Sequence, residues 1–397
     1  MNTIYVDNAA TTKMSKTAID AMMPFLEGTY GNPSSLHTVG QLAAEALVKA
    51  RQEVAECLGA DVKEIYFTSG GSESDNQALI TAADLGARKG KKHIISQKTE
   101  HHAILHALKK LEKQGFEVTL LDVDGEGYVS AEDVRKAIRE DTIMVTIMAA
   151  NNEIGTIMPI KEIAAVCKEK GVLFHTDAVQ AVGHIPLNVK DIGCDMLSLS
   201  AHKFHGPKGV GALYVRKGMF PSTLIEGGAQ ERSRRAGTEN IAGISSMAAA
   251  MKEAVAKIPE NTPKLIKMRD RLIEGLAEIP HSILNGSKTN RLPGSVNMCF
   301  EGIEGESLLL LLDAKGICAS SGSACTSGSL DPSHVLLAIG RPHEVAHGSL
   351  RLTLSEENSP EEMEFIIKSV KEVVEYLRRM SPIWQDLQEG KRQYVIQ

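Results

Sequence analysis

Strand-like and helix-like segments alternate along this chain from about residue 60 to residue 220. Short apolar runs that indicate strands occur at 65–68, 93–96, 118–121 and 143–148. Segments of helical character lie between them, at about 72–87, 103–114 and 160–170. Such alternation predicts an α/β fold, in which a mostly parallel sheet carries helices on both faces.

A second, smaller lobe is expected beyond the long helical stretch that ends near residue 256. The segment Ile258-Pro-Glu-Asn-Thr-Pro263 interrupts the helical pattern and is interpreted as the passage between the lobes. The segments that follow predict an α+β lobe, with a helix at 263–278, a strand at 295–300, and helices at 306–314 and 360–379. We expect three parts: a large domain of residues 15–260, a small domain of residues 1–14 and 261–380, and a polar C-terminal tail, 381–397, that is mobile or docks a partner.

The composition excludes several classes of function. The chain of 397 residues is long enough for two lobes, but its net charge of −6 supplies no general basic field for nucleic acid. The cluster Arg232-Ser-Arg234-Arg235 is a local exception that fits either a solvated loop or an anion-binding site. The chain begins without the basic and apolar regions of a signal peptide, and the leucine run 308–312 is too short to cross a bilayer. A cytoplasmic protein that makes no contact with a membrane is therefore expected.

Six cysteines are scattered along the chain, without a C-x-x-C pair and without the spacing of metal ligands. This pattern argues against a disulfide framework and against a structural zinc site. His101, His102 and His106 do not have a spacing that faces one ion, and no H-E-x-x-H motif is present. No metal is therefore expected.

Two apolar, strand-like runs end in residues of opposite charge. Residues 172–177 end in Asp177, and residues 195–203 end in Lys203. If the two strands pair, the carboxylate and the amine meet at the carboxyl edge of the sheet, where ligands bind in such folds. Pyridoxal 5'-phosphate (PLP) needs this pair, because the lysine forms a Schiff base and the acid keeps the pyridine nitrogen protonated. Considered alone, each residue is more often a surface lysine or a helix-capping aspartate.

A small-residue turn, Thr68-Ser-Gly-Gly71-Ser72, follows one predicted strand and opens a helix. Its backbone can approach an anion, and the N-terminus of the helix offers free N–H groups. By itself Ser72 fits an N-cap equally well. Joined to the Asp177–Lys203 pair, the turn predicts a cradle for the phosphate of the cofactor, to which Ser200 and His202 can add donors.

Three further residues are candidates for the same pocket. His101 follows the strand at 94–97, so its ring can stack on the pyridine and move protons. Asn152 follows the strand at 143–148, and Arg351 lies in an alternating strand pattern from which it can grip a substrate carboxylate. Taken alone, His101 fits an idle residue at a helix start, and Arg351 fits a surface strand.

Cys325 lies in the segment Ala319-Ser-Ser-Gly-Ser-Ala-Cys-Thr-Ser-Gly-Ser329. Its small neighbours offer little packing, so this loop of the small domain is expected to be mobile and to expose the sulfur. An exposed thiol is a liability unless it is used, which favours a nucleophile over an incidental loop cysteine.

These residues together resemble a family. The chain is similar to the cysteine desulfurases of the NifS/IscS kind, which are fold-type I PLP enzymes of the class-V aminotransferase family. The likeness runs almost end to end, through segments in a shared order: 5–12, 31–35 with His37, 99–101, 151–155, 175–180, 200–203, 235–240 and 321–325. The loop that ends in Cys325 is similar to that of the group with a long, mobile catalytic loop.

The resemblance implies a role for each candidate residue. Lys203 carries the cofactor, Asp177 pairs with its ring nitrogen, and His101 stacks on the ring and moves protons. Gln180 and Asn152 contact the ring oxygen or the substrate. Gly71, Ser72, Ser200 and His202 hold the phosphate, although many relatives have threonine where this chain has Ser72. Arg351 and Asn152 grip the substrate carboxylate. Thr238 reaches the phosphate of the other subunit, which implies a homodimer.

The implied reaction removes sulfur from L-cysteine. Lys203 takes the Cα proton of the bound substrate, and the Cys325 thiolate attacks the substrate sulfur, which leaves L-alanine and a persulfide on Cys325. The sulfur then passes to an acceptor such as an iron–sulfur scaffold protein. Nitrogenase assembly, tRNA thiolation and thiamine synthesis are alternative destinations.

Two other functions compete with this hypothesis. Another fold-type I reaction on an amino acid, such as selenocysteine lysis or transamination, would use Asp177 and Lys203 in the same way but would not need Cys325. A non-catalytic scaffold or sulfur-relay subunit would keep the fold for binding a partner, and an intact Lys203 argues against it.

Overall fold

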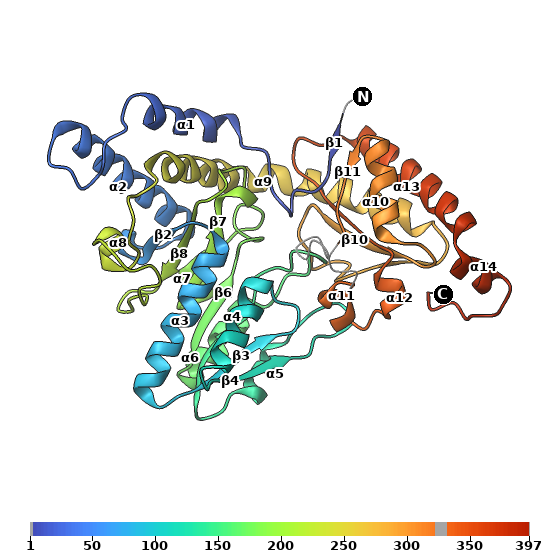
Figure 1. Ribbon diagram of the computed structural model, residues 1–397, viewed down its shortest axis with the longest axis horizontal. Coiled ribbons are helices and arrows are strands. Elements are labelled where there is room, and N and C mark those ends of the chain that lie inside the picture. The colour runs from blue at the N-terminus through green and yellow to red at the C-terminus, as the bar shows by residue number, and fades with distance from the viewer. Residues whose placement is uncertain (1–2, 322–331, 397) are drawn as a thin grey trace.

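A seven-stranded mixed sheet forms the centre of the larger lobe in the computed structural model, which describes residues 3–321 and 332–396 (Figure 1). The strand order is β2-β8-β7-β6-β5-β3-β4. The bounds are Ile65–Thr68 (β2), His93–Gln97 (β3), Glu117–Leu121 (β4), Thr142–Thr146 (β5), Leu173–Asp177 (β6), Met196–Ser200 (β7) and Gly211–Val215 (β8). The strands from β4 to β7 along this order run parallel, and β8 is antiparallel to both of its neighbours. The predicted α/β fold with a mostly parallel sheet is confirmed.

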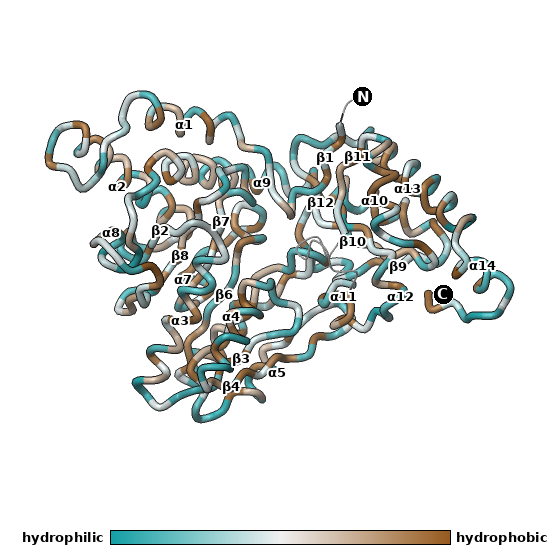
Figure 2. The backbone as a smooth tube through the Cα atoms, in the orientation of Figure 1, coloured by the Kyte–Doolittle hydropathy of each residue, from teal (hydrophilic) through white to brown (hydrophobic). Residues whose placement is uncertain are grey.

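Alternate side chains of a strand point to opposite faces of the sheet. Both sets are apolar here, so helices cover both faces. Ile95 and Val145 pack into one core with α2 (Thr38–Leu58), α6 (Ile160–Lys170) and the first part of α9 (Ile241–Ala277). Their neighbours Ile94 and Met144 pack into a second core with α3 (Gly71–Lys89) and α4 (His102–Glu112). Apolar residues predominate along the strands of this sheet in Figure 2, as strands buried on both faces require. Shorter helices complete the lobe: α1 (Lys16–Glu27), α5 (Ala131–Ala137), α7 (Val189–Ile192) and α8 (Gln230–Ser233).

The smaller lobe has a sheet of its own. Its strands β12 (Ser349–Thr353), β10 (Ser295–Phe300) and β9 (Ser282–Leu284) are antiparallel, while β1 (Ile4–Tyr5) pairs in parallel with β11 (Ile317–Cys318). The helices α10 (Gly305–Ala314) and α13 (Pro360–Met380) share a core with the second part of α9. The short helices α11 (His334–Ala338) and α12 (His343–Ala346) pack around Ile154 of the larger lobe.

One continuous helix, α9, joins the two lobes (Figure 1). The prediction of a break at Ile258–Pro263 is wrong, because Pro259 and Pro263 both lie inside the helix. Each proline removes one backbone hydrogen bond. The helix persists because its first part is buried in the core of the larger lobe and its second part in that of the smaller lobe. The predicted limits of the two domains stay a prediction.

The C-terminal tail packs back on the smaller lobe. It contains α14 (Pro382–Gln388), whose Trp384 lies under the guanidinium of Arg378, 3.9 Å from the ring centroid. The carboxylate of Glu301 accepts hydrogen bonds from the backbone N–H groups of Val395 and Ile396, at 2.8 and 3.1 Å. Ile396 is buried beside α11 and α12. The expectation of a mobile tail is therefore wrong for residues 381–396.

Within residues 3–321 and 332–396, we find no helix with the length and apolar character needed to cross a membrane.

We expect Ile396→Ala to lower the free energy of unfolding of the smaller lobe by about 2 kcal/mol, because it removes a buried side chain from the core around α11. Urea titration of the variant measures this effect. Val395→Ala is the matched control, since Val395 is 44% exposed and its truncation should cost less than about 0.5 kcal/mol. Equal unfolding midpoints for both variants and wild type would show that the tail adds no stability.

Candidate active site

A cavity of about 260 Å³ lies beyond the carboxyl ends of β5, β6 and β7. Parallel strands bring their carboxyl ends to the same edge of a sheet, where ligands bind in this class of fold. The cavity is lined by ten of the residues predicted for the site: Gly71, Ser72, His101, Asn152, Asp177, Gln180, Ser200, His202, Lys203 and Arg351. A larger cavity of about 740 Å³ lies in the smaller lobe between α12 and α14, but none of the described residues that line it is a lysine.

Lys203 follows β7 directly, at the end of a short 3₁₀ turn. Its Nζ donates hydrogen bonds to the backbone carbonyls of Ala9 and Ala10, at 2.6 and 2.8 Å. The backbone carbonyl of Lys203 accepts a hydrogen bond from His184 Nε2 at 2.8 Å. The amine is therefore directed toward the segment that follows β1, and its backbone is held from the opposite side.

Asp177 is the last residue of β6 and is 5% exposed. Burial raises the pKa of its carboxyl group to about 6, while the backbone N–H of Val179, 2.9 Å from Oδ1, and the charge of Lys203 oppose that rise. The carboxylate form is thus supported by a hydrogen bond and by a nearby cation. Gln180, one turn further on, donates from Nε2 to the carbonyl of Ala9 at 3.0 Å.

His101 is the N-cap residue of α4, and its Nδ1 accepts a hydrogen bond from the backbone N–H of Ala103 at 3.2 Å. Burial, followed by the charge of Lys203, lowers the pKa of the imidazole to about 4. The ring is therefore neutral at physiological pH and carries its proton on Nε2. A neutral, half-buried ring in the cavity can stack on a planar ligand and exchange a proton with it.

The first turn of α3 forms one wall of the cavity. Its N-cap is Gly70, which has no side chain to cap the helix, so the leading N–H groups remain available to an anion. A Cβ at Gly71 would lie 2.6 Å from Cγ2 of Val179, so this position admits no side chain. On the facing wall, burial and the charge of Lys203 lower the pKa of His202 to about 4, and its Nδ1 lies 3.1 Å from Oγ1 of Thr11.

Arg351 lies in β12 of the smaller lobe, lines the cavity and is 2% exposed. Its Nη2 lies 3.0 Å from Oδ1 of Asp7, and Nη1 donates to the carbonyl of Asn152 at 3.2 Å. Its Nε is buried and has no hydrogen-bond partner among the described residues. The guanidinium therefore keeps one donor that no described residue uses, on a side chain that lines the cavity.

Two predicted residues are not placed in this cavity. Thr238 is exposed and does not line it, so its contact with the site of another subunit stays a prediction. Cys325 lies outside the described residues. On both sides of it the chain is anchored beside the cavity: Ser320 pairs with Arg351 through the backbone, and His334 Nε2 donates to the carbonyl of Glu100 at 3.0 Å.

Sequence reasoning missed two parts of the site. Asp75 lines the cavity from α3, three residues after Ser72, and this helical spacing places both residues on one face of the helix. That spacing was an available signal. The carbonyls of Ala9 and Ala10 receive the amine of Lys203. Every residue type has a backbone carbonyl, so no sequence signal could have indicated them.

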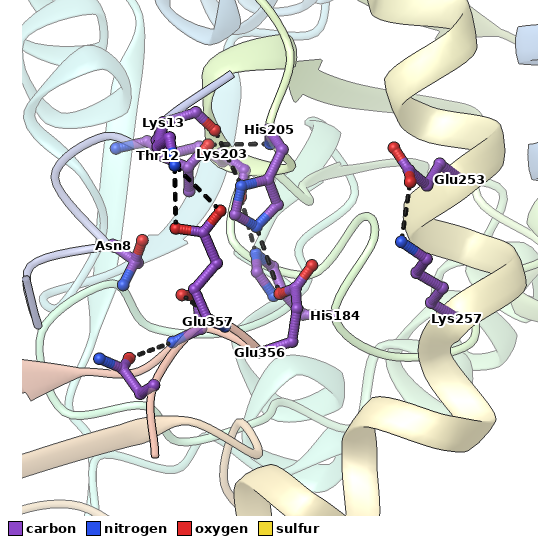
Figure 3. A network of polar contacts seen from close by, with 12 residues as sticks. Asn8, Thr12, Lys13, His184, Lys203, His205, Glu253, Lys257, Glu356 and Glu357 are labelled. Carbon is purple, nitrogen blue, oxygen red and sulfur yellow. Dashed lines mark hydrogen bonds and ion pairs between the residues drawn. The ribbon is translucent and has the colours of Figure 1, made fainter. Parts of the chain in front are cut away.

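A polar network behind Lys203 connects the two lobes (Figure 3). His205 lies two residues after Lys203, with a φ of 63°, and its Nδ1 donates to the carbonyl of Lys13 at 2.9 Å. Its Nε2 lies 3.4 Å from Oε2 of Glu356 in the smaller lobe. Figure 3 shows the two side chains pointing toward one another. The ion pair thus fastens the smaller lobe to the segment that carries the lysine.

The comparisons with known proteins agree with this site. The class-V aminotransferase family model matches residues 4–366. Cysteine desulfurase IscS of Methanosarcina thermophila is 56% identical over 380 residues, which cover 96% of this chain and 94% of that protein. Cysteine desulfurase IscS of Clostridium botulinum (strain Hall) is 52% identical over 393 residues, which cover 98% of this chain and 99% of that protein. The solved structure of a NifS-like protein is 39% identical and superposes with a TM-score of 0.89, covering 94% of this chain and all of that one.

The fold and the cavity define a fold-type I enzyme that uses PLP. The chain belongs to the class-V aminotransferase family, whose model covers most of its length. Within that family, both relatives described above carry the name cysteine desulfurase IscS. The resemblance to the cysteine desulfurases of the NifS/IscS kind is thereby confirmed.

The residues of the cavity fit PLP. The first turn of α3 offers N–H groups and a position, Gly71, that admits no side chain, as the approach of a phosphate requires. Lys203 supplies an amine for the aldehyde, and Asp177 supplies a carboxylate for the ring nitrogen. His101 lines the same cavity with a neutral ring that can stack on the pyridine.

The ion pair between His205 and Glu356 gives the protein a defined pH dependence. Burial opposes a charge on His205, but the hydrogen bond and charge of Glu356 outweigh it and raise the pKa of the imidazole above its usual 6.5. The same contact lowers the pKa of Glu356 to about 2, assisted by Lys257. The stabilisation from His205 is fully present below pH 6.5 and is lost as the pH rises through its raised pKa. The stabilisation from Glu356 is present above its usual pKa of 4.5 and is lost as the pH falls toward 2.

We therefore expect Glu356→Gln to destabilise the protein most between about pH 5 and 6.5, by roughly 1–2 kcal/mol, and progressively less as the pH rises above 7. Thermal unfolding at a series of pH values measures the difference from wild type. Glu357→Gln is the matched control, because Glu357 pairs with Lys13 in solvent, where the two side chains are 60% and 75% exposed. A pH-independent loss for Glu356→Gln would contradict the assignment.

Proposed function

We propose that this chain is a cysteine desulfurase, which uses PLP to remove the sulfur of L-cysteine and leaves L-alanine. The observation that carries the proposal is that an amine, an acid, a neutral imidazole and an arginine from the smaller lobe line one cavity. The names of the relatives that cover nearly the whole chain support the same activity.

The residues that would hold the cofactor all line this cavity. We assign the phosphate to Gly71, Ser72, Ser200 and His202, the ring nitrogen to Asp177, and the face of the ring to His101. Bound there, PLP supplies a sink for the electron pair released at the Cα of the substrate. Gln180 and Asn152 are proposed to contact the ring oxygen or the substrate.

The substrate carboxylate is proposed to bind Arg351. The guanidinium is held by Asp7 and by the carbonyl of Asn152, so it is oriented before substrate arrives, and its Nε is available within the described residues. A carboxylate that accepts from Nε relieves a buried donor, which favours binding. Lys203, whose Nζ faces the carbonyls of Ala9 and Ala10, would take the Cα proton, and His101 would move a proton at Nε2.

The nucleophile is proposed to be Cys325, which lies outside the described residues. Its thiolate attacks the substrate sulfur, so that the new S–S bond forms as the Cβ–S bond breaks, and Cβ gains a proton to become the methyl group of alanine. The anchors of the chain beside the cavity, at Ser320 and His334, support this assignment.

A single-turnover assay tests the function. We expect purified protein with bound PLP to form about one alanine per site from L-cysteine without a reductant, and to gain the mass of one sulfur atom. We expect Cys325→Ala to retain the visible absorption of the cofactor but to form no sulfur adduct. Cys318→Ala is the matched control, because it removes a neighbouring thiol that does not line the cavity.

Each other outcome assigns a different function. A keto acid in place of alanine would indicate transamination, and turnover of selenocysteine alone would indicate a lyase. A protein that binds no PLP would indicate the scaffold function. A sulfur adduct retained in Cys325→Ala would refute the nucleophile.

The protein is further proposed to work as a homodimer. Eight large apolar side chains are exposed between residues 19 and 48, on α1, on α2 and in the segment between them: Ile19, Met23, Leu26, Tyr30, Leu36, Val39, Leu42 and Val48. Exposed apolar patches of this kind mark protein interfaces. A second copy seated on this face would also explain why Thr238 is exposed in one chain, if it completes the phosphate site of the other.

We expect Leu36→Asp to convert the dimer to a monomer, because Leu36 is 94% exposed in the single chain and a charge there opposes burial. Light scattering after size-exclusion chromatography measures the mass. Leu310→Asp, on α10 of the smaller lobe, changes a leucine that is 73% exposed and should leave the mass unchanged. A wild-type protein of monomeric mass would contradict the proposal.

The sulfur acceptor, an iron–sulfur scaffold protein or another acceptor protein, stays a prediction. The expected cytoplasmic location also stays a prediction.

A further inference from the structure

Three buried carboxyl groups interact at the cavity, which Asp75 and Asp177 line and near which Glu100 lies buried. They come from three elements: Asp75 from α3, Glu100 from the segment between β3 and α4, and Asp177 from the end of β6. Their exposed fractions are 1%, 0% and 5%. Carboxylates that share a buried site repel one another and lose their hydration, so they cannot all be ionised together.

Asp177 has the surroundings of an ionised group. A backbone N–H, that of Val179, donates to its Oδ1 at 2.9 Å. The charge of Lys203 also favours its carboxylate form. Both contacts stabilise a negative charge on Asp177.

Asp75 has less support for a negative charge: burial and the charges of Asp177 and Glu100 raise its pKa, whereas a hydrogen bond with the hydroxyl of Ser198 lowers it. Its Oδ1 is buried without a hydrogen-bond partner among the described residues, and lies 3.8 Å from His175 Nε2. The imidazole of His175 is committed to two hydroxyl groups, with Nδ1 2.8 Å from Oγ1 of Thr146 and Nε2 2.9 Å from Oγ of Ser198. Burial lowers the pKa of His175 to about 3, so the ring is neutral and cannot balance a charge on Asp75.

Glu100 adds to the repulsion without supplying a counter-charge. Its Oε1 accepts from the backbone N–H of Met148 at 2.7 Å and from Gln97 Nε2 at 3.0 Å, and its Oε2 is buried with no partner in the described part of the chain. Burial raises its pKa to about 8. For Asp75, burial and then the charge of Asp177 raise the pKa well above the usual 3.8.

We propose that Asp75 is a positioning residue that holds a proton in the working enzyme, so that Asp177 carries the negative charge facing the ring nitrogen of the cofactor. This inference rests on the proposed function, because it assigns Asp177 to that ring. A second charge at Asp75 would raise the pKa of Asp177 and protonate it. A neutral Asp75 leaves Asp177 ionised and able to keep the ring nitrogen protonated.

Three isosteric variants of the PLP-bound protein separate the carboxyl groups: Asp75→Asn, Glu100→Gln and Asp177→Asn. Infrared difference spectra at about pH 7, where an ordinary carboxyl group is ionised, record the carbonyl stretch of a protonated acid. We expect Asp75→Asn and Glu100→Gln each to lose one such band. We expect Asp177→Asn to retain both bands and to bind PLP about tenfold more weakly or worse, whereas Asp75→Asn binds PLP within about twofold of wild type.

A second measurement tests the link between the two aspartates without changing Asp75. In Asp177→Asn the repulsion on Asp75 is absent, so the Asp75 band should titrate at a lower pH than in wild type. A residue with a purely structural role would show no such shift. This measurement remains available if Asp75→Asn fails to fold.

Two results would overturn the inference. One is an infrared spectrum that Asp75→Asn leaves unchanged, which would show that Asp75 is already ionised. The other is a loss of PLP affinity in Asp75→Asn as large as that in Asp177→Asn. A protein that binds no PLP would instead refute the proposed function, and the infrared bands could still be recorded from it.

Discussion

The parallel pairing of β6 with β7 is the contact on which the site depends. It places Asp177 opposite Ser198, so the chain that continues from β7 carries Lys203 past the edge at which Asp177 ends its own strand. Side chains alternate along a strand, so a slip of one residue would turn Asp177 to the other face of the sheet. The strands β5 and β8 flank the pair and hold its register from both sides.

The parts of the site that could be predicted are those governed by local chain geometry. Asp177 and Lys203 end apolar runs, and Gly71 follows a strand and opens a helix, so a parallel sheet brings them together whatever the rest of the chain does. The sequence also indicated that Arg351 lies in a strand. It did not indicate the partner of Arg351, because Asp7 is separated from it by 344 residues and meets it through the pairing of β1 in the smaller lobe.

The parts that failed depend on packing between distant segments. Pro259 and Pro263 predict a break, yet α9 continues because each end is buried in a different core. The polar composition of the tail suggested mobility, yet Glu301 holds its last described residues through their backbone. Asp75 has an ordinary position on an amphipathic helix, and its unusual character arises from the carboxyl groups that other elements bring to it.

The N-terminal segment around Ala9 and Ala10, which receives the amine of Lys203, gains some of its partners late in the synthesis of the chain. Asn8 bonds to Thr353 across 345 residues of sequence, and β1 has no strand partner until β11 has been made. At a translation rate of about 5–20 residues per second, residues 4–12 wait on the order of tens of seconds on the ribosome before that partner exists. The large sheet can form in that interval, whereas Asn8 and β1 gain these partners only after β11 and β12 have been made. The segment of residues 4–12, which receives the amine of Lys203, is therefore among the last parts of the enzyme to acquire its native surroundings.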